Sequence, residues 1–173
     1  IFILSLIASA EVPLPQPSSA ERAYKARPLP LSSVRLLGGP LKNAQDLDGR
    51  YLLSLENDRM LAYLRRSAGL KSKAKGYGGW DGDGRQLTGH IAGHYLSAVS
   101  LMWAATGDVR FRERADSMVR ELKEIQEKQG DGYLGALQDK EGVAGKIRFQ
   151  ELAKGKIISG GFDLNGLWSP WYV

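Results

Sequence analysis

The chain has 173 residues, which corresponds to about one domain. Hydrophobic residues make up 43% and charged residues 25%, a balance that excludes a disordered tail, a collagen-like repeat and a coiled coil. Cysteine is absent, so these residues hold no disulfide, thiolate zinc site or cysteine nucleophile. The net charge is +5, and much of the excess lies in residues 59–75, on a helix end and the loop after it. That placement predicts a solvated surface and no nucleic-acid partner, since nucleic acids favour charge on one helix face or between stacking aromatics.

The N-terminus carries the pattern of an export signal. Residues 1–7 are almost entirely apolar and are followed by Ala8-Ser9-Ala10, which is typical of the end of a signal peptide. The run is too short to span a bilayer, which needs about 20 apolar residues. A buried strand is the alternative, but the prolines that follow favour a linker. We therefore expect a signal-peptide remnant at 1–10, a Pro/Ser-rich linker at 11–33, and a secreted or periplasmic protein with no membrane contact after cleavage.

Residues 34–173 form the main predicted domain, and its first helical stretch spans 41–68. Leu47, Tyr51 and Leu55 recur at four-residue spacing, as on one face of a helix. Asn57-Asp58 interrupts this pattern, and we expect Asp58 to cap a second short helix. A long glycine-rich loop follows at 70–86.

The second helix, expected at 87–105, contains no charged residue. A helix that is apolar nearly all round is buried on nearly all sides. Gly107 and Asp108 then predict a helix stop followed at once by a new N-cap.

The third helix, expected at 109–129, is amphipathic. We expect Asp116–Arg120 and Glu124–Lys128 to form i,i+4 ion pairs on its surface. Its predicted inward stripe consists of Ala115, Met118, Val119, Leu122 and Ile125.

A buried helix followed by an amphipathic one predicts an antiparallel inner and outer pair. A final helix is expected to start near Pro170, because proline is favoured at the first helical position. The sequence starts with isoleucine and ends within an aromatic run at 171–173, so we expect a piece of a longer protein. The predicted fold class is all-α, an incomplete (α/α)6 toroid of antiparallel inner and outer helix pairs.

A loop rich in glycine, with Trp80, Asp81 and Arg85, precedes the buried helix. A tryptophan ring suits the apolar face of a sugar, and charged groups suit its hydroxyls. Asp81-x-Asp83-Gly84 resembles part of a calcium-binding loop, but position 92, where that loop needs a glutamate, is alanine. The alternative is that Asp81 and Asp83 only shape the turn.

His90 and His94 lie four residues apart, on one face of the buried helix. No cysteine or nearby carboxylate completes a ligand set, so we expect no metal site here. The two imidazoles could bind sugar hydroxyls; alternatively, they bond to the loop backbone and hold the loop in place. No pair of carboxylates marks an acid and a base for glycoside hydrolysis.

Four segments together carry a family resemblance. They are Gly79-Trp80-Asp81 through Arg85, Thr88, His90 and His94 to Ala98; Ala104 to Asp108; Gly130-Asp-Gly-Tyr133-Leu134; and Gly161 through Asn165, Trp168 and Pro170 to Tyr172. In this order they resemble the N-terminal part of the β-L-arabinofuranosidase-type glycoside hydrolases, family 127 and its relatives. The substrate-binding candidates are Trp80, Asp81, Arg85, His90, His94 and Trp168.

The resemblance implies an (α/α)6 barrel with the substrate pocket at one end. It also implies retaining hydrolysis of L-arabinofuranosides by a zinc-bound cysteine thiolate with a glutamate as acid/base, all in the later half of the barrel. We therefore expect no catalytic residue in this chain, no activity of the chain alone, and zinc only in the full-length protein. The alternatives are a polysaccharide lyase on the same toroid, which the basic loop at 59–75 would suit, and a non-catalytic carbohydrate-binding helical domain.

Overall fold

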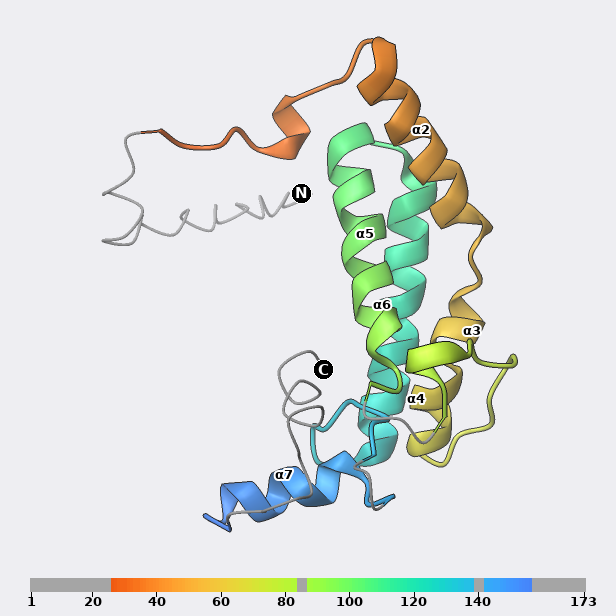
Figure 1. Cartoon of the computed structure of the whole chain (residues 1–173), viewed down its shortest axis with the longest axis vertical. Helices are drawn as coiled ribbons and strands as arrows, with labels where there is room; N and C mark the ends of the chain where they lie inside the picture. Colours follow the sequence, from red (N-terminus) through yellow and green to blue (C-terminus); the bar gives the residue numbers. More distant parts are fainter. Residues whose placement is uncertain (1–25, 84–86, 139–141, 157–173) are drawn as a thin grey trace, which may run out of the picture. The chain divides into compact units, whose positions relative to one another are not determined.

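The computed structural model describes residues 26–83, 87–138 and 142–156, so the predicted signal peptide, most of the linker and the helix near Pro170 lie outside the described residues. The chain divides into two units, 1–30 and 31–173, and the described part of the first, residues 26–30, is exposed. The elements of the second unit are η1 (Leu31–Ser33), α2 (Gly39–Ser54), α3 (Asn57–Met60), α4 (Ala62–Ser67), η2 (Gly79–Asp81), α5 (His90–Thr106), α6 (Val109–Gln129) and α7 (Gly145–Ala153) (Figure 1).

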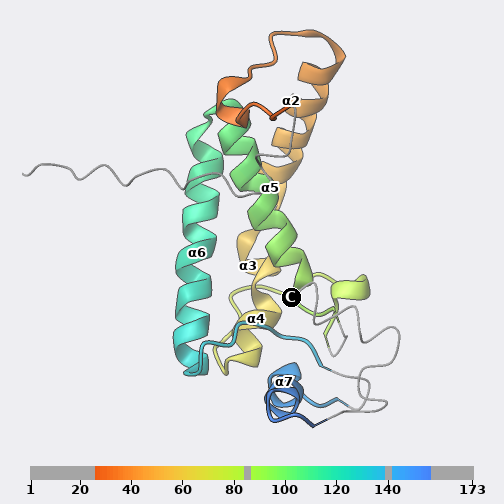
Figure 2. The ribbon, with the colours of Figure 1, turned by 90° about the vertical axis from the view of Figure 1, so that its left-hand side faces the viewer.

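The all-α class is confirmed, since the described ranges contain no strand and only an isolated bridge between Gln138 and Ala144. The helices α5 and α6 lie side by side in both views (Figures 1 and 2). They run antiparallel because Gly107, with φ 73°, ends α5 and Asp108 starts α6 at once. The Asp108 carboxylate accepts a hydrogen bond of 3.0 Å from the Arg110 N–H, which confirms the predicted N-cap. An antiparallel helix pair of this kind is the unit expected of an α/α toroid.

The predicted break in the first helical stretch is present between α2 and α3. The expected cap is wrong, however, because Asp58 lies inside the first turn of α3 and Glu56 precedes the helix without a capping hydrogen bond. A side chain from another helix, α6, binds the carbonyl groups at the C-terminal end of α2. Arg114 of α6 donates to the carbonyls of Leu53 and Leu55 at 2.9 and 2.7 Å. A positive side chain at a helix C-terminus also complements the negative end of the helix dipole.

The core lies between α3, α4, α5 and α6. Its buried side chains are Met60, Leu61, Leu64, Ala92, Tyr95, Val99, Phe111, Met118, Ile125 and Ala136. On α6 the fully buried positions are 111, 118 and 125, which recur every seven residues. Val119 is 54% exposed, so its place in the predicted inward stripe is wrong. The reason is geometric, because position 119 lies about 100° round the helix from Met118.

The helix α5 is less buried than its composition predicts. Ala92, Tyr95 and Val99 are buried, whereas Leu101 is 56% and Trp103 42% exposed. Within the described residues, packing covers one face of α5 rather than nearly all sides. The helix also begins at His90, three residues later than expected, because Gly89 adopts a φ of 86° that is outside a helix. None of the described helices has the length and apolar composition that a membrane span requires.

Arg65 of α4 is buried, and it links α4 to α6. Its guanidinium donates to the carboxylates of Glu121 at 2.6 Å and Glu124 at 2.7 Å. The predicted pair of Glu124 with Lys128 is therefore wrong, and Asp116 pairs with Arg112 at 3.6 Å instead of Arg120. A buried guanidinium needs such partners, because an unpaired buried charge is strongly unfavourable.

This ion cluster predicts a defined pH dependence of stability. The hydrogen bond from Arg65 holds the pKa of Glu124 below its ordinary value of 4.5. A carboxyl whose pKa is lower in the folded state stabilises the fold above the unfolded pKa, and this stability is lost as the pH falls through the folded pKa. We expect Arg65→Met to lower the urea midpoint at pH 7 and to flatten its decline below about pH 4.5.

Asp108, Asp131 and Glu151 also have lowered pKa values, so the comparison between variants isolates the Arg65 contribution. Arg120→Met, on the exposed surface of α6, which also carries Glu124, is the matched control and should leave the pH profile unchanged. Parallel profiles for Arg65→Met and the wild type would contradict the prediction.

Candidate functional site

The predicted sugar-binding residues that the structure describes gather where the glycine-rich loop enters α5. The short helix η2 places two neighbouring side chains in opposite environments. Trp80 is 54% exposed, whereas Asp81 is only 3% exposed. The Trp80 ring lies over the loop-to-helix junction, with its centroid 5.8 Å from that of His90. Arg85 and Trp168 lie outside the described residues.

Asp81 caps the helix α5 from outside it. Its Oδ1 accepts a hydrogen bond of 3.0 Å from the Ile91 N–H, ten positions further along the chain. Burial raises the pKa of the Asp81 carboxyl, while hydrogen bonds from the backbone of Ile91, His90 and Gly89 and the charge of His90 act in the opposite direction. The carboxylate thus satisfies N–H groups that the first turn of a helix leaves without intrahelical partners. This geometry favours the turn-shaping alternative for Asp81.

A second contact closes the loop at its base. The Thr88 hydroxyl, which is buried, donates to the Gly82 carbonyl at 2.6 Å. Asp83, by contrast, is exposed and pairs with Arg66 at 2.9 Å. The sequence did not predict that Thr88 closes the loop. The one sequence signal for this role was a hydroxyl side chain just before α5.

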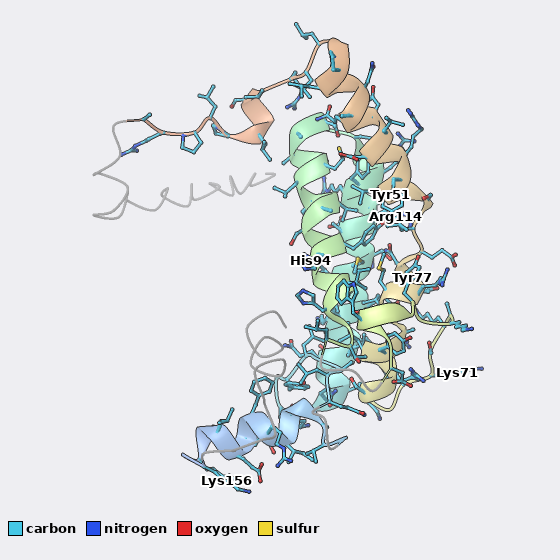
Figure 3. All side chains as sticks on the ribbon, viewed as in Figure 1. Tyr51, Lys71, Tyr77, His94, Arg114 and Lys156 are labelled. Atoms are coloured by element: carbon cyan, nitrogen blue, oxygen red, sulfur yellow. The ribbon has the colours of Figure 1, made fainter. Side chains whose placement is uncertain are left out.

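His90 and His94 are bonded to each other. Their Nε2 atoms lie 2.7 Å apart, and their rings meet edge to face with centroids 4.4 Å apart. In this contact one ring nitrogen donates a hydrogen bond and the other accepts it. His94, labelled in Figure 3, projects from the exposed surface of α5. Trp80, His90 and His94 therefore form one continuous cluster, which we call the ring cluster.

The ring cluster lacks the composition of a metal centre. Within the described ranges, no three His, Cys, Asp or Glu side chains are grouped so that they could hold a metal ion. The zinc–thiolate set that the resemblance implies does not fit these 173 residues, since they contain no cysteine. What the cluster does offer is an apolar ring face beside imidazole hydrogen-bonding groups, which suits a neutral polyhydroxylated ligand.

Comparison with known proteins agrees with this chemistry. Residues 33–173 match the family described as β-L-arabinofuranosidase, GH127 catalytic domain. The match places the chain among the glycoside hydrolases. More narrowly, the chain belongs to the GH127 family. A search of curated proteins finds no match.

Proposed function

We propose that this chain supplies part of the sugar-binding wall of an exported, retaining β-L-arabinofuranosidase. The observation that carries the proposal is the ring cluster at the N-terminal end of α5, in a chain that belongs to the GH127 family. Twelve toroid helices of ordinary length, with their connections, need on the order of 240–360 residues. The nucleophile and the acid/base then come from other parts of a longer protein.

In this proposal the ring cluster binds and orients the sugar. The exposed face of Trp80 packs against the C–H face of an arabinofuranoside. The imidazoles of His90 and His94 exchange hydrogen bonds with its hydroxyls. An indole cannot attack the glycosidic carbon, and the two imidazoles are bonded to each other, so the contribution of the cluster is to binding.

Part of the basic segment at 59–75 is already paired, which favours a hydrolase over a lyase. A lyase would use free cations to bind an acidic sugar. Lys73 instead pairs with Glu121, at 2.5 Å, and Arg66 pairs with Asp83. The Arg59 guanidinium lies 4.0 Å from the centroid of the Tyr77 ring.

We expect Trp80→Ala and His90→Ala to weaken hydrolysis of p-nitrophenyl β-L-arabinofuranoside by the intact protein. A lost hydrogen bond costs about 0.5–1.5 kcal/mol, and up to about 3 kcal/mol where a buried partner is left unsatisfied. His90→Ala should therefore lower kcat/KM by about 3- to 200-fold, with residual activity retained.

The matched control is Trp103→Ala, which removes an exposed indole at the other end of α5. It should leave kcat/KM within about twofold of the wild-type value, as expected of a residue outside the site. Folded Trp80→Ala and His90→Ala proteins with wild-type kinetics would refute the proposed binding role. Sugar binding without hydrolysis by the intact protein would instead identify a non-catalytic carbohydrate-binding domain.

Two finer parts of the proposal have separate tests. Export predicts a mature N-terminus at Glu11, and N-terminal sequencing of the secreted or periplasmic protein measures it directly. A retaining mechanism predicts that the arabinose is first released as the β anomer. Time-resolved NMR of the products distinguishes the β anomer from the α anomer. An N-terminus upstream of Ala8, or initial release of the α anomer, would contradict the respective part.

A further inference from the structure

We infer that Asp81 is a positioning residue, whose buried carboxylate fixes Trp80 and His90 relative to each other. The inference rests on the proposed function, because it assigns how the ring cluster is held in the geometry that binds sugar. Asp81 itself is 3% exposed, so its carboxylate acts through these neighbours rather than on a ligand.

Asp81 connects the loop that carries Trp80 to the start of α5. It directly follows Trp80 in η2, so any movement of its backbone moves the indole. Its Oδ1 is 3.0 Å from the backbone nitrogen of Ile91, the residue after His90. One side chain therefore connects the segment that carries the indole to the helical turn that carries the imidazole.

The N-cap residue of α5 cannot take over this task. The residue at the N-cap position is Gly89, which has no side chain and a φ of 86°. A local serine or aspartate cap would satisfy the first turn of α5 but leave the loop free. A cap from ten positions upstream satisfies the same turn and fixes the loop with it.

Two other described polar contacts of the loop do not reach the first turn of α5. The Thr88 hydroxyl bonds to the carbonyl of Gly82, which closes the loop base behind Trp80. Asp83 pairs with Arg66 of α4. Among these three polar contacts of the loop, the one from Asp81 reaches the first turn of α5, where His90 begins the helix.

The test compares Asp81→Ala, Asp81→Asn and Asp83→Ala in the intact protein, with p-nitrophenyl β-L-arabinofuranoside as substrate. Asp81→Ala should raise KM by about 3- to 30-fold, the loss of one or two sugar contacts, with kcat within about threefold. Asp81→Asn keeps an Oδ1 acceptor for the Ile91 N–H and should restore KM to within about threefold of wild type. Asp83→Ala, which removes an exposed carboxylate two residues away, should leave KM unchanged.

A double-mutant cycle separates positioning from general stability. If Asp81 acts through the rings, the effect of Asp81→Ala on KM should shrink at least threefold when Trp80 and His90 are already alanine, because interacting sites are non-additive. A residue that only stabilises the fold would show the same effect in both backgrounds. The indole N–H resonance of Trp80, assigned with Trp80→Phe, gives a readout without sugar and should shift toward the free-indole position in Asp81→Ala.

The outcomes are distinct from those of the proposed function. If Trp80→Ala and His90→Ala do not change kinetics, the proposed function fails, and the indole resonance alone then decides whether Asp81 positions the rings. If those variants weaken binding but Asp81→Ala has wild-type KM and an unshifted resonance, the inference is overturned. If Asp81→Ala does not fold, Asp81→Ser replaces it, and a wild-type KM and resonance in that variant overturn the inference equally.

Discussion

Gly89→Ala is expected to lower the free energy of unfolding by about 2–5 kcal/mol. Gly89 has a φ of 86°, a conformation that costs an L-residue about 1–2 kcal/mol. A Cβ at this position would also lie 3.2 Å from Leu64 Cδ2 and 3.4 Å from Ala136 Cβ, two buried side chains. Crowding a packed core adds about 1–3 kcal/mol. The urea midpoint of the intact protein measures the change.

Gly107→Ala is the matched control for Gly89→Ala. Gly107 has a similar φ of 73°, but the nearest atom that its Cβ would meet is Arg35 Nη2, at 3.9 Å. We expect the backbone strain alone, about 1–2 kcal/mol. Equal losses for the two variants would show that packing against Leu64 and Ala136 adds nothing. A loss below 1 kcal/mol for Gly89→Ala would contradict the described turn into α5.

Met118→Ala is expected to lower the free energy of unfolding by about 2–5 kcal/mol. The Met118 side chain is fully buried on α6 and belongs to the core shared with α5. Truncating a buried methionine removes its transfer free energy and leaves a cavity, which together give losses of this size. Because the core joins α3, α4, α5 and α6, the variant should lower the thermal midpoint of the whole unit rather than fray one helix.

Val119→Ala is the control one residue further along the same helix. The Val119 side chain is 54% exposed, so its truncation should change the free energy of unfolding by less than about 0.5 kcal/mol. This pair of variants tests the orientation of α6 directly. Comparable losses at both positions would mean that α6 is rotated from the orientation described, toward the stripe that the sequence alone predicts.

Local sequence signals were sufficient to predict where α6 begins and ends. Its start and end follow from Asp108, which caps through its own carboxylate, and from Gly130, which ends the helix with a φ of 80°. Both signals act within two or three residues, so a single sequence displays them fully. The break before α3 was also predictable, but the capping role of Asp58 was not realised.

Other contacts, both in the core and at the candidate site, join segments that are distant in the sequence, and the sequence alone did not predict them. Glu124 bonds to Arg65, 59 positions away, rather than to a neighbour on its own helix. The carboxylate of Asp81 was predicted as a sugar ligand or a turn former, and its bond to the first turn of α5 has no local sequence signature. Spacing did place His90 and His94 on one face, because i,i+4 proximity is a property of any helix. Their bond to each other required the rotamers that the structure gives.

The remote cap on α5 also couples two motions that are separate in most helices. Fraying of a helix end is ordinarily local, but the first turn of α5 can open only if the Asp81 contact breaks as well. The loop and the turn then form one cooperative opening unit. Deuterium uptake at the amide of Ile91 should consequently report loop opening, and its slow exchange in the presence of sugar would measure how strongly a ligand holds this unit closed.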